Sequence, residues 1–75
     1  MFTKATPESN VKLIALGKRI KKFRNIKGIT QVEFSNICDM EKSSISKIEA
    51  GLVNVTYLTL DRISCCLGVD LKELV

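Results

Sequence analysis

Apolar residues recur every three or four positions along most of the chain, which is the spacing of one buried face of an α-helix. In the longest stretch these residues are Leu13, Leu16, Ile20 and Phe23. No stretch has the alternation of apolar and polar residues, bounded by hairpin turns, that predicts a β-strand. The pattern therefore predicts five helical segments, at about residues 7–27, 31–38, 42–50, 57–67 and 69–74.

Capping residues mark the ends of these helices. Thr6 precedes a proline, a combination typical of a helix start. Thr30 and Glu33 have the spacing of a capping box, in which each side chain accepts a hydrogen bond from the other residue's backbone N–H. Gly28 and Gly68 follow the last residues of two helices, where a left-handed backbone favours glycine. We therefore expect separate helices joined by tight turns.

The length of 75 residues allows one domain. We expect residues 1–10 to be an N-terminal arm that can be flexible, and residues 11–75 to be the folded domain. The apolar side chains of the middle and last helices are assigned to its core, namely Phe34, Ile37, Met40, Leu60, Ile63 and Leu67.

The composition excludes several kinds of chemistry. The chain has no histidine, which excludes histidine-based catalysis and histidine-ligated zinc. We also find no nucleophile with a base, no metal-binding cluster and no phosphate-cradling loop, so we expect no enzyme activity, no metal and no cofactor.

Cysteine content and hydropathy indicate the compartment. Cys38, Cys65 and Cys66 are an odd number, and the chain starts with no secretory signal, which together indicate a reduced, cytoplasmic protein. We expect these cysteines to pack as small apolar side chains, since a redox-sensing role lacks a cue for a low thiol pKa. No apolar run approaches the roughly 20 residues of a membrane span, so we expect no membrane association.

Positive charge is concentrated at one end of the chain. Residues 1–28 contain eight lysines and arginines and one glutamate, a net charge of +7, whereas residues 29–75 carry −3. A basic pole indicates a polyanionic partner such as nucleic acid. A solvated helix face has the same composition, so charge alone leaves both interpretations open.

Residues 30–51 carry the most specific pattern, T-Q-V-E-F-S-N-I-C-D-M-E-K-S-S-I-S-K-I-E-A-G, which predicts two short helices joined by a tight turn. The second helix, about Lys42–Glu49, has serines and lysines on its outer face. Ile45 and Ile48 form its apolar anchor. A helix that lies in the major groove of DNA needs small polar or cationic side chains outside and such an anchor beneath.

This stretch resembles the helix-turn-helix of phage repressors and Cro proteins, the xenobiotic-response-element family of regulators. The resemblance includes Gly17–Gln31 and Leu67–Leu74, and covers about residues 12–75. It implies an all-α fold, a compact five-helix lambda-repressor-like DNA-binding domain. The implied function is sequence-specific transcriptional regulation, with repression expected, by a homodimer on an inverted repeat in double-stranded DNA.

The resemblance also implies roles for individual residues. The positions that contact base edges are Lys42, Ser43, Ser44 and Lys47. The positions that contact the DNA backbone are Thr30, Gln31, Ser46, Asn54, Thr56 and Tyr57. A structural ion pair, rather than a base contact, is expected between Arg24 and Glu49. The expected dimer interface consists of apolar residues late in the chain, Leu52, Val53, Val69, Leu71, Leu74 and Val75.

The sequence departs from the family pattern at three places. Glu41 replaces the usual Ser or Thr cap of the recognition helix. A carboxylate at this position suits the helix dipole but repels a nearby phosphate. The Glu41 side chain either accepts a hydrogen bond from cytosine N4 or points away from the DNA. Asp39 replaces the glycine of the turn, so it must adopt a left-handed backbone at a cost on the order of 1 kcal/mol. Leu52 and Val53 occupy positions that are commonly basic, which predicts fewer phosphate contacts.

Other function classes stay open. Domains of this family also bind proteins, as antitoxins or as partners of other regulators, so a toxin, another regulator or RNA polymerase is an alternative partner. RNA is a weaker alternative, because the chain offers no platform of aromatic side chains for base stacking.

Overall fold

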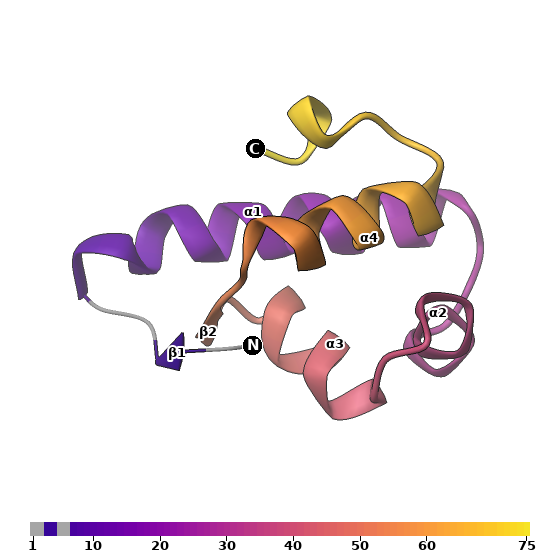
Figure 1. Cartoon of the computed structure of the whole chain (residues 1–75), viewed down its shortest axis with the longest axis horizontal. Helices are drawn as coiled ribbons and strands as arrows, with labels where there is room; N and C mark the ends of the chain where they lie inside the picture. Colours follow the sequence, from indigo (N-terminus) through magenta and orange to yellow (C-terminus); the bar gives the residue numbers. More distant parts are fainter. Residues whose placement is uncertain (1–2, 5–6) are drawn as a thin grey trace.

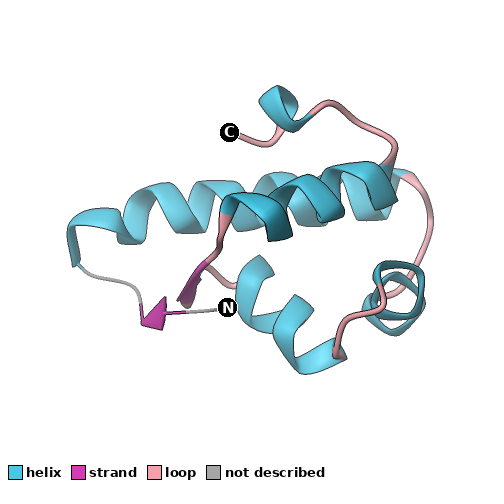
Figure 2. Ribbon diagram, in the orientation of Figure 1, coloured by secondary structure: helices cyan, strands magenta, loops and turns pink. Residues whose placement is uncertain are grey.

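The computed structural model describes residues 3–4 and 7–75, and Figures 1 and 2 show how its elements are arranged. The predicted cap Thr6 lies outside the described residues. Within them the chain forms four α-helices, two short strands and one turn of 3-10 helix. In chain order these are β1 (Thr3–Lys4), α1 (Pro7–Ile26), α2 (Gln31–Cys38), α3 (Lys42–Glu49), β2 (Val53–Asn54), α4 (Tyr57–Leu67) and η1 (Leu71–Glu73).

The all-α prediction holds, but the predicted fifth helix is only the 3-10 turn η1. The N–H of Leu74 donates to the carbonyl of Leu71 at 2.9 Å, which is the i to i+3 bond of a 3-10 helix. Gly68 ends α4 in the left-handed conformation, with φ of 70°. After it, only Leu71–Glu73 are helical, a length typical of a 3-10 turn.

The two strands were not predicted. Thr3 pairs with Asn54 and Lys4 with Val53 in an antiparallel bridge. Two residues per strand are too few to show an alternating pattern in the sequence. In the structure, the first ten residues include β1 and the start of α1, so helical structure begins at Pro7 within the segment that we expected to be an arm.

The helix α1 crosses the centre of the molecule, with α2 and α3 on one side and the C-terminal turn on the other (Figure 1). Among its residues from Asn10 on, those that face the core are apolar or small, apart from Arg24. Where burial is described, from residue 10 onward, the buried apolar side chains are Leu13, Leu16, Ile20, Phe34, Cys38, Ile45, Ile48, Ile63, Leu67 and Leu74. Within the described residues, no helix is long and apolar enough to span a membrane.

The core assignment is wrong at Ile37, whose side chain is 54% exposed. In α2 the buried face passes through Phe34 and Cys38, which are one turn apart, and Ile37 lies beside this line. Met40 and Leu60 are half-buried and pack against the core from its edge.

At Gly17 the backbone of α1 lies directly against the end of α3. A Cβ atom at this position would collide with the carbonyl oxygen of Glu49 and would lie 2.6 Å from that of Ile48. Glycine therefore allows the C-terminal end of α3 to rest directly on the backbone of α1.

Candidate nucleic-acid interface

The outer side of α3 is a polar ridge. Lys42, Ser43 and Lys47 are exposed, whereas Ile45 and Ile48 beneath them are 1% and 2% exposed. At about 100° per residue, the exposed side chains fall within an arc of about 140°. We call this surface, Lys42, Ser43, Ser46 and Lys47, the α3 ridge. It offers cations and hydroxyl groups to a ligand, and its position is fixed by the packed isoleucines.

The remaining serine of this helix is less accessible. Ser44 was expected to contact bases, but it is half-buried and lies about 60° beyond Lys47 around the helix. Ser46 is also half-buried, although it lies between Lys42 and Ser43 on the ridge.

Asp39 forms the turn between α2 and α3 in the conformation that the sequence predicts. Its φ and ψ are 54° and 48°, in the left-handed region. Its N–H donates to the carbonyl of Asn36 at 3.3 Å, and the next N–H, of Met40, donates to the carbonyl of Ser35 at 2.9 Å. These bonds fix the angle at which α3 leaves α2.

Glu41 precedes α3, but its side chain does not cap the helix. Instead, the Ser43 hydroxyl donates to Oε2 of Glu41 at 3.4 Å. An exposed carboxylate therefore lies beside one end of the α3 ridge. Ser43 keeps its lone pairs, so it can still accept a hydrogen bond from a ligand.

A buried ion pair ties α3 to α1. Nε of Arg24 donates to Oε2 of Glu49 at 2.7 Å, and Nη2 donates to Oε1 at 3.0 Å. The third nitrogen, Nη1, donates to the carbonyl of Ile29 at 2.9 Å. The hydrogen bond to Glu49 raises the pKa of Arg24 above its ordinary value, against the opposing effect of burial. Arg24 thus stays charged and faces the protein interior, not the ridge.

Gln31 joins this ion pair, which the sequence did not indicate. Its Nε2 donates to Oε1 of Glu49 at 3.0 Å, and this bond joins the start of α2 to the end of α3. An amide nitrogen carries two hydrogens, so one remains for a phosphate. Thr30 is similar, because its hydroxyl accepts from the N–H of Glu33 at 3.1 Å and can still donate its own hydrogen.

The start of α4 offers fewer free groups than expected. The Thr56 hydroxyl accepts from the N–H of Thr59 at 3.2 Å and donates to the Thr59 hydroxyl at 2.9 Å. The hydroxyl hydrogen of Thr56 is therefore already donated to the Thr59 hydroxyl. Tyr57, which is 69% exposed, and Asn54, which is exposed in β2, remain accessible.

The predicted dimer residues fall into three groups by burial. Leu74 is 0% exposed and belongs to the core of its own chain, so its assignment to a dimer interface is wrong. The reason is that η1 turns the chain back and directs Leu74 inward. Leu52 and Val75 are 62% and 69% exposed. The other three, Val53, Val69 and Leu71, are half-buried.

The cysteine pair between α2 and α4 has the character of core packing. Cys38 is 2% exposed, and Cys66 donates from Sγ to the carbonyl of Ile37 at 3.8 Å. Burial, together with a hydrogen bond to Cys66, raises the pKa of the Cys38 thiol. The thiol form, which is not the reactive one, is therefore favoured at Cys38.

Comparison with known proteins places this geometry in context. A model of the helix-turn-helix family matches residues 20–74. The control protein C.MunI of Mycoplasma sp is 37% identical over 62 residues, which cover 81% of this chain and 84% of that protein. The structure of the restriction-modification controller protein C.AhdI from Aeromonas hydrophila has a TM-score of 0.83 at 23% identity, covering 87% of this chain and 98% of that one. SinR, a master regulator for biofilm formation solved in complex with DNA, has a TM-score of 0.73 at 32% identity, covering 79% and 95%.

Proposed function

The chain belongs to the helix-turn-helix family of xenobiotic-response-element type and is a DNA-binding transcriptional regulator, and from this premise we propose that the α3 ridge reads base edges in the major groove. The observation that carries the proposal is the exposed row of Lys42, Ser43 and Lys47 above the buried Ile45 and Ile48. An α-helix with its side chains is about 10–12 Å in diameter, which suits the roughly 12 Å width of that groove.

Within the ridge, the lysines are the proposed readers of guanine. Lysine can donate to O6 and N7 of guanine, and a serine hydroxyl can contact any base. Ser43 and Ser44 are proposed to add such permissive contacts. Because Ser43 is bonded to Glu41, we expect it to act as an acceptor, and the nearby carboxylate favours the amino group of cytosine.

The proposed backbone contacts surround the recognition helix. Thr30 and Gln31 each keep one hydrogen for a phosphate oxygen at the start of α2. Ser46, Asn54, Thr56 and Tyr57 are the further positions, with Thr56 contributing mainly through the N-terminus of α4. These contacts carry no sequence information, but they fix the orientation of the α3 ridge.

We further propose that the protein acts as a repressor and as a homodimer in the cytoplasm. One recognition helix covers only a few base pairs, so useful specificity requires two. A two-fold dimer would bind an inverted repeat with half-site centres about 34 Å apart. Occupation of such a site in a promoter would block transcription.

Selection from a pool of random duplex DNA tests this function. We expect an inverted repeat containing guanine, and we expect Lys47→Ala to relax the preference at one position per half-site, worth about 1–3 kcal/mol. Lys72→Ala, which removes an exposed lysine from η1, is the matched control and should leave the selected sequence unchanged. Failure to enrich any duplex would contradict DNA reading and favour the alternative, a protein-binding module such as an antitoxin.

A further inference from the structure

Two thiols from separate parts of the sequence lie together where α2 packs on α4. Cys38 is the last residue of α2 and is buried. Cys66 is the last residue but one of α4 and is half-buried. Its Sγ donates to the carbonyl of Ile37 at 3.8 Å, and this carbonyl belongs to the peptide unit that ends at the Cα of Cys38. The backbone geometry thus makes Cys38 and Cys66 neighbours.

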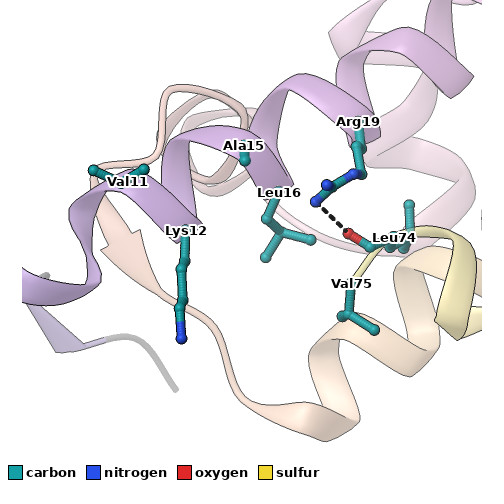
Figure 3. Close-up of a pocket in the computed structure, with 7 residues that line it drawn as sticks. All are labelled: Val11, Lys12, Ala15, Leu16, Arg19, Leu74 and Val75. Atoms are coloured by element: carbon teal, nitrogen blue, oxygen red, sulfur yellow. Dashed lines mark hydrogen bonds between the residues drawn. The ribbon is translucent and has the colours of Figure 1, made fainter.

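The surrounding packing holds both thiols in place. Phe34, one turn before the thiol of α2, and Leu67, next to the thiol of α4, are both buried. Beyond α4, the chain end is fastened to α1, since Nη1 of Arg19 donates to the carbonyl of Leu74 at 3.4 Å (Figure 3). The ends of α2 and α4 therefore cannot separate without loss of core contacts.

The two thiols differ in access. Cys66 is half-buried, whereas Cys38 is 2% exposed, so a small oxidant from solvent reaches Cys66 first. Burial raises the pKa of the Cys38 thiol, and the positive charge of Arg62, one turn before Cys66 on α4, acts in the opposite direction. Cys38 is thus protected from direct oxidation, but it is next to the sulfur that becomes oxidised.

We propose that Cys38 and Cys66 form a redox modification site, which hydrogen peroxide converts into a reversible disulfide that fastens α2 to α4. The Cys66 thiolate attacks one peroxide oxygen, so an S–O bond forms, the O–O bond breaks, and the leaving hydroxide takes up a proton to become water. Cys38 then attacks the sulfur of this sulfenic acid, which forms the S–S bond and releases the second oxygen as water. In total the two thiols lose two electrons and two protons, and one peroxide is reduced to two waters. Thiol reductants reverse the oxidation by exchange.

The disulfide closes residues 38–66 into a covalent ring that contains all of α3. Such a crosslink restricts the unfolded chain far more than the folded one. Oxidation should therefore stabilise the helix-turn-helix and raise its melting temperature by about 10 °C or more. This property goes beyond DNA binding and does not depend on it.

Treatment of the whole reduced chain with one equivalent of hydrogen peroxide, at low protein concentration, tests the proposal. Mass spectrometry should show a loss of about 2 Da, because two hydrogens leave, and the free thiols should fall from three to one. Trypsin cuts after Lys42 and Arg62, which puts Cys38 and Cys66 in separate peptides, so a joined pair of peptides identifies the bond. Dithiothreitol should restore the thiols and the original melting temperature.

The third cysteine provides a matched control. Cys65 is exposed and lies about 100° around α4 from Cys66, so Cys65→Ser should keep the joined peptides and the rise in melting temperature. Cys66→Ser should lose both, and Cys66→Ala, which keeps an apolar side chain, should behave in the same way. Far-UV circular dichroism verifies that each variant is folded.

Three results would overturn the proposal. The first is a wild type that keeps three free thiols, or in which no peptide is joined through Cys38. The second is a joined pair of peptides that persists in Cys66→Ser and disappears in Cys65→Ser. The third is an oxidised protein that melts no higher than the reduced protein, which would mean that the bond does not lock α2 to α4.

Discussion

At the scale of single residues, the Glu49 carboxylate is the point where three parts of the chain meet. It accepts from Arg24 of α1 and from Gln31 at the start of α2, and it belongs to the end of α3. Both partners of the ion pair are below 10% exposed. Removal of one partner would leave a buried charge without compensation, which is far more costly than loss of a surface pair.

We therefore expect Arg24→Ala to lower the free energy of unfolding by about 3–5 kcal/mol. Urea denaturation followed by circular dichroism measures this loss. Arg62→Ala removes an exposed arginine from α4 and should change stability by no more than about 0.5 kcal/mol. Equal midpoints for the two variants would show that the ion pair does not hold α3 in place.

Gln31 gives a second prediction at this scale. Gln31→Ala removes one hydrogen bond to Glu49, so stability should fall by only about 1 kcal/mol. If the second Nε2 hydrogen of Gln31 is donated to a phosphate, Gln31→Ala should weaken binding to specific and random duplexes by a similar factor. Titrations with the two kinds of duplex measure this. Asn36→Ala, an exposed change in the same helix, is the control. A loss confined to the specific duplex would instead assign Gln31 to base reading.

These residues also show how far the sequence predicts the site. The family pattern pairs Arg24 with Glu49, and the turn at Asp39 follows from the spacing of the two short helices. The bond from Gln31 to Glu49 depends on how α2 crosses the end of α3, which joins residues 18 positions apart and leaves no local signal. Likewise, helical spacing makes Ile37 a candidate for the core. It is exposed because α2 packs through its neighbours Phe34 and Cys38.

At the scale of elements, the contact of α1 with α3 depends on one missing side chain. Replacing Gly17 with alanine favours the helix by about 1 kcal/mol. The added methyl group, however, must displace two backbone carbonyls of α3, which cannot rotate away as a side chain would. Overpacking costs about 1–3 kcal/mol or more, so the unfavourable effect should exceed the gain.

Gly17→Ala is thus expected to lower the melting temperature and to weaken DNA binding, because α3 must shift. Gly28→Ala is the control, since nothing lies within 4 Å of a Cβ at that position and only its φ of 72° opposes the change. Its cost should stay near 1 kcal/mol, with DNA binding preserved in the folded protein. Unchanged DNA binding by Gly17→Ala would mean that the recognition helix tolerates movement on α1.

Element boundaries follow from the sequence where a cap specifies them. Thr30 with Glu33 forms the capping box that the spacing predicts, and Thr56 caps α4. The last element differs because its apolar pattern fits an α-helix, whereas its hydrogen bonds are those of a 3-10 turn. The pairing of β1 with β2 joins residues 51 and 49 positions apart, and two-residue strands have no periodic signal.

At the scale of the whole molecule, charge is divided between two surfaces. The α3 ridge carries Lys42 and Lys47, whereas the outer face of α1 carries Lys18 and Lys22, both exposed. Lys18 and Lys22 lie about 100° and 140° around α1 from Gly17, so they point away from α3. These two lysines therefore cannot contact bases in the groove that holds α3. Their positive charge still attracts a polyanion at a distance.

Replacement of Lys18 and Lys22 by glutamine should therefore slow association with DNA without changing which sequence is preferred. Attraction between charges at a distance raises the association rate. At 0.15 M salt this attraction decays over about 8 Å. The decrease in the association rate should therefore be several-fold at low salt and should become smaller as salt rises. Stopped-flow measurements over a salt series give the rates, and selection from random DNA gives the preference. Lys42→Gln, a change within the ridge, should do the reverse and alter the selected sequence. If the double variant changes the sequence preference, then the outer face of α1 lies against the duplex, and the proposed docking of α3 must be replaced.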